Sequence, residues 1–208
     1  MPSILKRIFS RKLTAIYGLV GPLLTYAFIL IAISLAPWFS WTANALSDLG
    51  NIVTHTASAP VFNYGLIIGG VVITLFAIGM VLEVKGNIMG LLGALTLVTS
   101  GLGIFFVGVF PENFILQHVI SAFTYFISII VGSFLFGVAY STRKSTRFLG
   151  VLVFALGVVA AFGLFLLPIL IQLPGAAIPE MIGSVAQYIW VIIICARLLS
   201  GKSAIPKK

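Results

Sequence analysis

Charged residues are scarce in this sequence, and it has a single cysteine. Only 8% of the 208 residues are charged, whereas 61% are hydrophobic, and the mean hydropathy is +1.22. A water-soluble domain of this size needs more polar surface than the sequence provides, which excludes that class of protein. Because Cys195 is alone, an internal disulfide, a thiolate metal cage and a Cys-x-x-Cys redox pair are excluded as well. The composition therefore indicates an integral membrane protein.

Acidic residues are scarcer than basic ones. The chain has 4 Asp and Glu against 12 Lys and Arg, which gives a formal net charge of +8. Such an excess can indicate a nucleic-acid partner, but here long apolar runs separate the basic residues. We therefore expect the basic residues to set membrane orientation, and we expect no nucleic acid to bind. They fall into the N-terminal tail, two short turns near residues 85 and 143–147, and the C-terminal end.

Six apolar segments are each long enough to cross the hydrocarbon layer, which takes about 20 helical residues. The sequence predicts an all-α fold, a polytopic bundle of six transmembrane helices that forms a single domain over residues 1–208. The expected spans lie near residues 14–36, 62–83, 88–110, 117–140, 147–172 and 180–200. No lysine falls within any of them, which excludes a retinal Schiff base.

The positions of the basic residues predict the orientation. An even number of spans places all four basic segments on one side, and the positive-inside rule makes this side cytoplasmic. We therefore expect a multi-pass protein of the cell membrane with cytoplasmic N- and C-termini. The connections 37–61, 111–116 and 173–179, which contain no Lys or Arg, would then be extracytoplasmic.

Glycine is abundant, with 21 residues, and much of it lies inside the expected spans. Gly65-x-x-x-Gly69 has the spacing that lets two membrane helices approach closely. Packing within one chain and dimerisation of two chains are both compatible with this spacing. Pro22 and Pro168 should kink the first and fifth spans, because proline removes a helical hydrogen-bond donor.

Most of the other ionisable residues collect at the expected extracytoplasmic ends of the helices. Asp48, Glu112, His118 and Glu180 come from separate segments on that side. Polar residues at helical spacing extend from there into the fourth and sixth spans, so these polar faces should meet in the bundle interior. The sequence predicts a polar pocket that is open to the outside and closed toward the cytoplasm. Its further lining is expected to be Ser47, Ser121, Tyr125, Ser184, Gln187 and Tyr188.

These ionisable residues suggest two kinds of chemistry. Histidine and carboxylates are suited to a divalent metal such as zinc, for which His118, Glu112 and His55 are the candidate ligands. Without a metal, the four residues named above are candidate catalytic acids and bases. The simpler interpretation is that the hydroxyls and amides bond neighbouring helices, and that Asp48 accepts hydrogen bonds within a turn.

Several short motifs resemble a known family. They are Ala45-Leu46-Ser47-Asp48-Leu49-Gly50, Phe62-Asn63-Tyr64-Gly65, Gly108-Val109-Phe110-Pro111-Glu112 followed by His118, and Pro179-Glu180 ahead of Trp190. The order and spacing of these motifs resemble those of the membrane-protein family called domain of unknown function 998, and the resemblance covers nearly the whole chain. The resemblance implies six helices, a bacterial or archaeal origin and no established activity. A more distant similarity to eukaryotic membrane proteins of the Frag type implies work on lipid or glycolipid at the outer face.

Two classes of function are compatible with these features. The protein could bind or remodel membrane lipid in the outward-facing pocket, as an enzyme or as a binding protein. Alternatively, it could be a non-catalytic accessory or structural subunit, in a homo-oligomer or a larger membrane complex. A small transporter fits less well, because the cytoplasmic halves of the spans carry few polar groups. No cation is available for a phosphate headgroup on the outer side, which argues against a simple phospholipid phosphatase.

Overall fold

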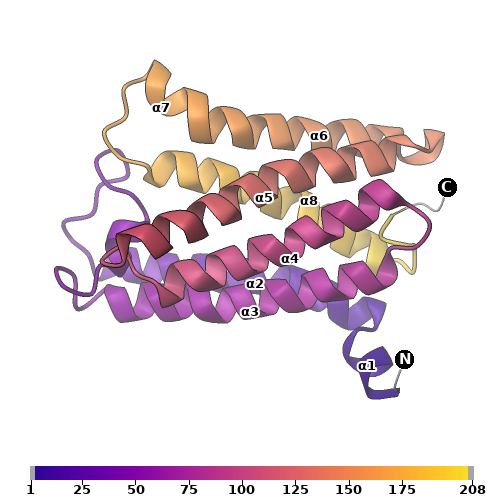
Figure 1. Cartoon of the computed structure of the whole chain (residues 1–208), viewed down its shortest axis with the longest axis horizontal. Helices are drawn as coiled ribbons and strands as arrows, with labels where there is room; N and C mark the ends of the chain where they lie inside the picture. Colours follow the sequence, from indigo (N-terminus) through magenta and orange to yellow (C-terminus); the bar gives the residue numbers. More distant parts are fainter. Residues whose placement is uncertain (1–2, 206–208) are drawn as a thin grey trace.

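The structure is a computed structural model that describes residues 3–205, and this part of the chain contains helices and no strands. Six helical segments are long and apolar enough to cross a membrane. They are α2 (Arg11–Ser34), α3 (Ala59–Glu83), α4 (Ile88–Val109), α5 (Ile115–Ser141), the segment Lys144–Leu170, and α8 (Ala177–Leu199). A short helix, α1 (Ser3–Ile8), precedes them and projects from one end of the bundle (Figure 1). The predicted all-α bundle of six spans is confirmed.

The fifth span is not one regular helix. It consists of the turn η2 (Lys144–Thr146), α6 (Arg147–Ala161), the π-helical turn η3 (Phe162–Leu166) and α7 (Leu167–Leu170). Pro168 lacks the N–H that would bond the carbonyl of Leu164, which lies inside the π turn, so the irregularity has a local cause. In contrast, α2 continues through Pro22 without a break.

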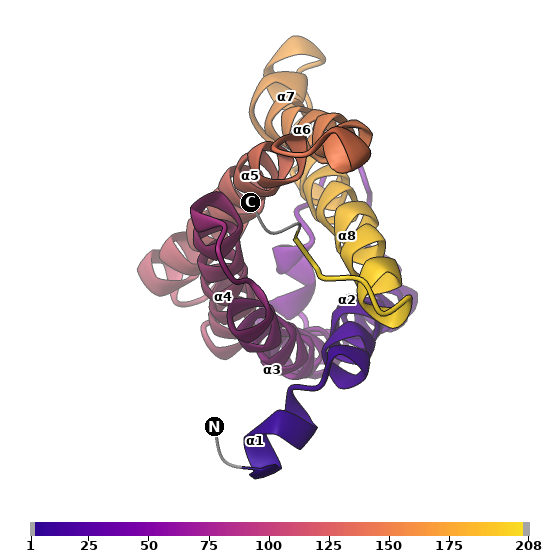
Figure 2. The same cartoon turned by 90° about the vertical axis from the view of Figure 1, so that its right-hand side faces the viewer.

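The six spans form a closed ring. Each span contacts the next one in the chain, from α2 to α6, and α8 completes the ring by contacting both α6 and α2. Figure 2 shows this ring from one end of the molecule. Large side chains with almost no exposure, among them Phe76, Leu97 and Trp190, form the core that the spans share.

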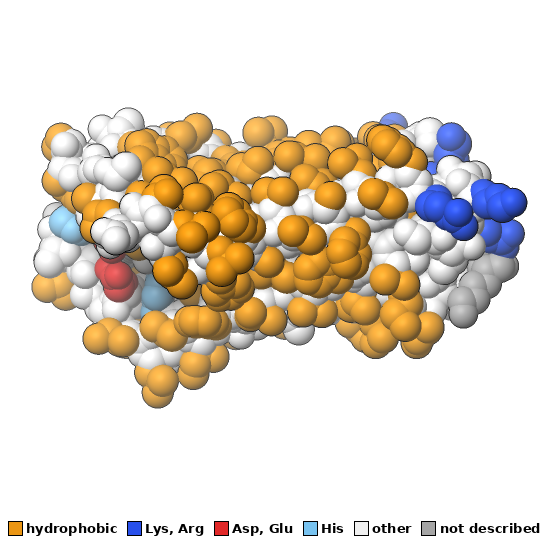
Figure 3. Space-filling view, turned by 90° about the horizontal axis from the view of Figure 1, so that it is seen from above, with side chains coloured by type: hydrophobic (Ala, Val, Ile, Leu, Met, Phe, Trp, Pro, Cys, Tyr) orange, Lys and Arg blue, Asp and Glu red, His pale blue; other side chains and the backbone are white. Residues whose placement is uncertain are grey.

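The two ends of the bundle differ in charge. All Lys and Arg side chains between residues 4 and 205 lie at one end, here called the basic end, together with both ends of the described chain (Figures 1 and 3). The opposite end, here called the acidic end, carries Asp48, Glu112 and Glu180 on or beside the loops that join α2 to α3, α4 to α5 and α7 to α8. The remaining acidic residue, Glu83, pairs with Arg11 at 2.8 Å at the basic end. A mainly hydrophobic surface separates the two ends (Figure 3).

Glycine lets α2 and α3 approach closely. A Cβ atom at Gly65 would overlap Phe28 of α2, and one at Gly69 would overlap Thr25 of the same helix. The Gly65-x-x-x-Gly69 face is therefore occupied by a helix of its own chain. This placement accounts for the spacing without a second copy of the protein.

The chain that follows α8 folds back over the basic end. The hydroxyl of Tyr140 donates a hydrogen bond to the carbonyl of Ala204 at 2.6 Å, and Ala204 and Ile205 are both buried. Arg197 contacts the same segment: its Nη2 donates to the carbonyl of Ser203 at 3.3 Å, and its guanidinium lies over the Tyr140 ring. Side chains and backbone together close the bundle at this end.

Candidate functional site

An elongated cavity runs through the bundle between α2, α3, α4, α5 and α8. It contains about 870 Å³ of space free of atoms, counted with the part open to solvent. Apolar side chains make up most of its wall.

The cavity extends along the helix axes rather than across them. Its lining includes Gly18 and Ile29 of α2, and Glu180 and Val191 of α8. Each pair is separated by eleven residues, which corresponds to roughly 16 Å at the rise of an α-helix. The cavity therefore reaches from the acidic end past the middle of the bundle, because Gly18 and Phe76 lie nearer the basic ends of α2 and α3 than the acidic ends.

Polar groups of three segments line the cavity at the acidic end. They are Ser47 in the short turn η1 (Ser47–Gly50), His118 at the start of α5, and Glu180 in the first turn of α8. Glu180 is half-buried, and its Oε2 accepts a hydrogen bond from the backbone N–H of Leu46 at 2.8 Å. This contact holds the loop before α3 against the start of α8.

His118 has a defined orientation. Its side chain is only 8% exposed, and Nδ1 lies 2.9 Å from the carbonyl oxygen of Phe110. A carbonyl can only accept, so the neutral imidazole must carry its proton on Nδ1 and leave a lone pair on Nε2. No hydrogen bond joins Nε2 to any other atom of the described residues, and the ring lines the cavity. His118 therefore offers the cavity a hydrogen-bond acceptor.

Asp48 and Glu112 lie at the acidic end but outside the cavity lining. Asp48 Oδ2 accepts hydrogen bonds from the side-chain amide of Asn44 at 2.8 Å and from the N–H of Ala45 at 3.1 Å, so it acts as a turn acceptor. The pKa of Glu112 is raised, first by partial burial and then by the charge of Asp48 and a hydrogen bond between the two carboxyls. The two carboxyl groups are thus close neighbours.

Below the acidic end, most polar side chains of the cavity wall already have partners. Gln187 donates to Ser100 Oγ at 3.0 Å, and the Tyr188 hydroxyl donates to the carbonyl of Leu19 at 2.9 Å. Ser184 bonds the carbonyl of Met181 within its own helix at 3.1 Å. Tyr125 is buried and also lines the wall. The deeper cavity is therefore mainly an apolar surface for a ligand.

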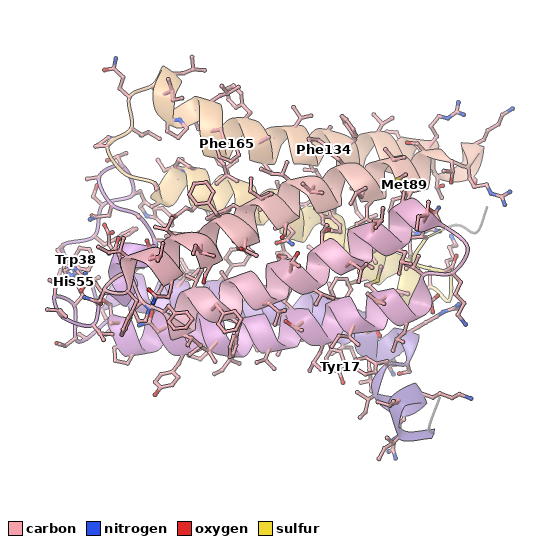
Figure 4. All side chains as sticks on the ribbon, viewed as in Figure 1. Tyr17, Trp38, His55, Met89, Phe134 and Phe165 are labelled. Atoms are coloured by element: carbon pink, nitrogen blue, oxygen red, sulfur yellow. The ribbon has the colours of Figure 1, made fainter. Side chains whose placement is uncertain are left out.

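Two predicted site residues, Ser121 and His55, do not line the cavity. Ser121 is buried and donates to the carbonyl of Gln117 in its own helix at 2.7 Å, outside the cavity lining. His55 stacks on Trp38, with ring centroids 3.6 Å apart and planes inclined by 18° (Figure 4). Among residues 3–205, no three His, Cys, Asp or Glu side chains gather closely enough to hold a metal ion. The candidate ligands His118, Glu112 and His55 do not come together as one set.

Sequence reasoning missed the contribution of α2. Gly18, Pro22, Thr25 and Tyr26 line the cavity from this helix, and Tyr26 packs against Tyr188 with ring centroids 5.8 Å apart. The four residues recur at helical spacing on one face, and this was the available signal. It was hidden because none of them carries a charge.

Comparison with known proteins gives a family. The family model described as "Protein of unknown function (DUF998)" matches residues 19–197, which include every span at least in part. The chain belongs to the DUF998 family. No curated protein and no solved structure matches it. The match takes in nearly the whole cavity wall of this DUF998 protein, from α2 to α8.

Proposed function

We propose that this DUF998 protein binds a membrane lipid by taking an acyl chain into the cavity and holding the polar head at the acidic end. The observation that carries this proposal is the distribution of chemistry along the cavity. Its wall is mostly apolar, whereas the acceptor groups of His118 and Glu180 lie at one end. An amphiphile has the same two-part character.

The dimensions support a chain of ordinary length. On α3 the lining extends from Phe62 to Phe76, roughly 21 Å along the helix axis, which is about two-thirds of the hydrocarbon layer of about 30 Å. With a volume of about 870 Å³ spread along this length, the cavity is elongated rather than round. These features favour one extended chain over a bulky ring system.

The charge distribution supports a location for the head. All Lys and Arg side chains of the described chain from residue 4 onward lie at the basic end, and the positive-inside rule assigns such an end to the cytoplasm. The acidic end, and with it the lipid head, would then face the extracytoplasmic leaflet of the cell membrane.

Binding is favoured over transport by the closed basic end. A transporter needs alternating access from both sides, whereas Tyr140, Ala204 and Ile205 pack together at the basic end. Remodelling of the bound lipid is the second candidate function, because His118 Nε2 is available as a proton acceptor beside the cavity.

Mass spectrometry of co-purified lipid tests the proposal. Ala122 of α5 lines the cavity, so Ala122→Phe should fill it and reduce the lipid retained after purification in detergent. Ala27 of α2 is exposed on the outside of the bundle, and Ala27→Phe is the matched control. We expect wild type and the control to retain the same lipid, and A122F to lose most of it. Equal retention by all three folded proteins would contradict the proposal.

A further inference from the structure

We propose that the lipid head held at the acidic end is a hydrogen-bond donor without negative charge, an ammonium or hydroxyl group, and that phosphate and carboxylate heads are rejected. The inference rests on the proposed function and specifies the class of ligand. Two observations carry the inference. The first is which polar atoms of the cavity lining have no hydrogen-bond partner among the described residues, and the second is the charge of the groups around them.

The head must supply the selectivity. An acyl chain in the bilayer is already out of water, so its transfer into an apolar cavity gains little from the hydrophobic effect. Discrimination between lipids therefore depends on the polar groups at the acidic end.

The first free group is an acceptor. His118 is more than nine-tenths buried, and its Nδ1 proton is committed to the carbonyl of Phe110 at 2.9 Å. Nε2 is left with a lone pair and no protein donor among the described residues. A ligand with an O–H or N–H group can donate a hydrogen bond to this lone pair from the cavity.

The second free group is also an acceptor. Glu180 uses Oε2 for the N–H of Leu46, and no hydrogen bond within residues 3–205 occupies Oε1. Ser47, beside it in the cavity lining, has a hydroxyl that can act in either direction. The donors that the cavity lining offers to a phosphate head are hydroxyls, and none of the lining residues carries a positive charge.

Backbone donors at the start of α8 are largely committed as well. The start of a helix often binds an anion through its free N–H groups. Before α8, the N–H of Gly175 donates to the carbonyl of Thr42 at 3.0 Å, and that of Ala177 donates to Asn44 at 2.9 Å. Pro179 in the first turn has no N–H at all.

The surrounding charge has one sign. Asp48 lies two residues after Leu46, whose N–H donates to Glu180, and Glu112 is a close neighbour of Asp48. No Lys or Arg lies at this end in the described part of the chain. On the face that Figure 3 draws, the dark blue of Lys and Arg is seen only at the opposite end. An anionic head would face these carboxylates without a counter-charge, which is unfavourable in a poorly hydrated site.

A competition between four amphiphiles with the same chain tests the inference. Dodecylamine, dodecanol, dodecanoate and dodecyl phosphate are added in equal amounts to the protein in phosphatidylcholine nanodiscs at neutral pH. Native mass spectrometry then measures which are bound, with A122F nanodiscs as the baseline. We expect the amine and the alcohol together to exceed each anion by about tenfold, which corresponds to about 1.4 kcal/mol.

The arms of the experiment separate the possible results. Preference for the amine assigns the selectivity to charge, and preference for the alcohol assigns it to hydrogen bonding; both support the inference. Binding of dodecyl phosphate or dodecanoate at the level of the amine and alcohol overturns it, while leaving the proposed function intact. Failure of all four to exceed the A122F baseline overturns the proposed function itself.

Two variants locate the selectivity. Glu180→Gln keeps an oxygen for the Leu46 N–H but removes the charge and puts an NH2 donor in place of Oε1, so the ratio of bound amine and alcohol to bound anions should fall. Glu83→Gln removes a carboxylate at the opposite end and should leave the ratio unchanged. An unchanged ratio in E180Q would overturn the assignment of the head to this carboxylate.

Discussion

His118 Nδ1 lies 2.9 Å from the carbonyl oxygen of Phe110, eight residues earlier in the chain. Phe110 directly follows α4, and His118 is in the first turn of α5. The hydrogen bond thus connects α4 and α5 across the loop between them. It also fixes the orientation of the imidazole ring and so determines which edge of the ring faces the cavity. One contact serves both the fold and the site.

This contact predicts a single imidazole tautomer. Nitrogen NMR of selectively labelled protein should show that the neutral ring of His118 carries its proton on Nδ1, because the carbonyl can only accept. His55 is the internal reference, since its ring stacks on Trp38 and has no hydrogen bond that fixes a tautomer. Finding the proton of His118 mainly on Nε2 would contradict the predicted acceptor in the cavity.

The Asp48–Glu112 pair predicts a pH dependence of stability. Because the pKa of Glu112 is raised in the folded protein, the folded state binds more protons than the unfolded state between the ordinary and the raised pKa. Stability should therefore fall as the pH rises from about 4.5 through the raised value. Thermal unfolding measured across this range should show the decrease.

Two substitutions check the origin of this dependence. Asp48→Asn removes the neighbouring charge and should move the pKa of Glu112 back toward its ordinary value, as seen in carboxyl infrared bands. Glu112→Gln should flatten the pH dependence in the same window. A dependence that persists unchanged in E112Q would assign it to another group.

The Glu180–Leu46 hydrogen bond predicts how firmly the loop before α3 is held. Glu180→Ala leaves the N–H of Leu46 without its acceptor, at a cost of about 1–3 kcal/mol if no water replaces the carboxylate. Hydrogen exchange of residues 44–50 should accelerate in this variant. Glu180→Gln retains an acceptor oxygen and should exchange like the wild type; equal acceleration in both variants would show that charge, not the hydrogen bond, holds the loop.

Close packing of α2 against α3 predicts a further destabilisation. Gly65→Ala places a methyl group on Phe28 and should cost about 1–3 kcal/mol through overpacking, measured by unfolding in mixed micelles. Val71→Ile adds a methylene to an exposed position of the same helix and is the control. Light scattering should show the same mass for wild type and G65A, whereas a drop from dimer to monomer would indicate that this face joins two chains.

Most of the fold could be predicted from hydropathy because each span must satisfy its backbone within one helix in lipid. The third span, expected at 88–110, is α4 at Ile88–Val109. The π turn Phe162–Leu166 was not foreseen. Pro168 predicted an irregularity but not its form, which depends on how the neighbouring helices pack around it.

The candidate site was less accessible to sequence reasoning. Polarity and spacing placed Ser47, His118 and Glu180 at one end, and all three line the cavity. Ser121 shares the polar face of α5 but bonds a carbonyl of its own helix, as serine often does in membrane helices. Spacing gives the face of a helix but not its rotation in the bundle, so lining residues and packing residues look alike in sequence.

The contact between Tyr140 and Ala204 also implies an order of assembly. Ala204 follows all six spans in the chain, so its carbonyl reaches the Tyr140 hydroxyl only after every helix has been synthesised. During synthesis the Tyr140 hydroxyl therefore has no such acceptor until the sixth span has been made, and the packing of the basic end is the last part of the bundle to be completed.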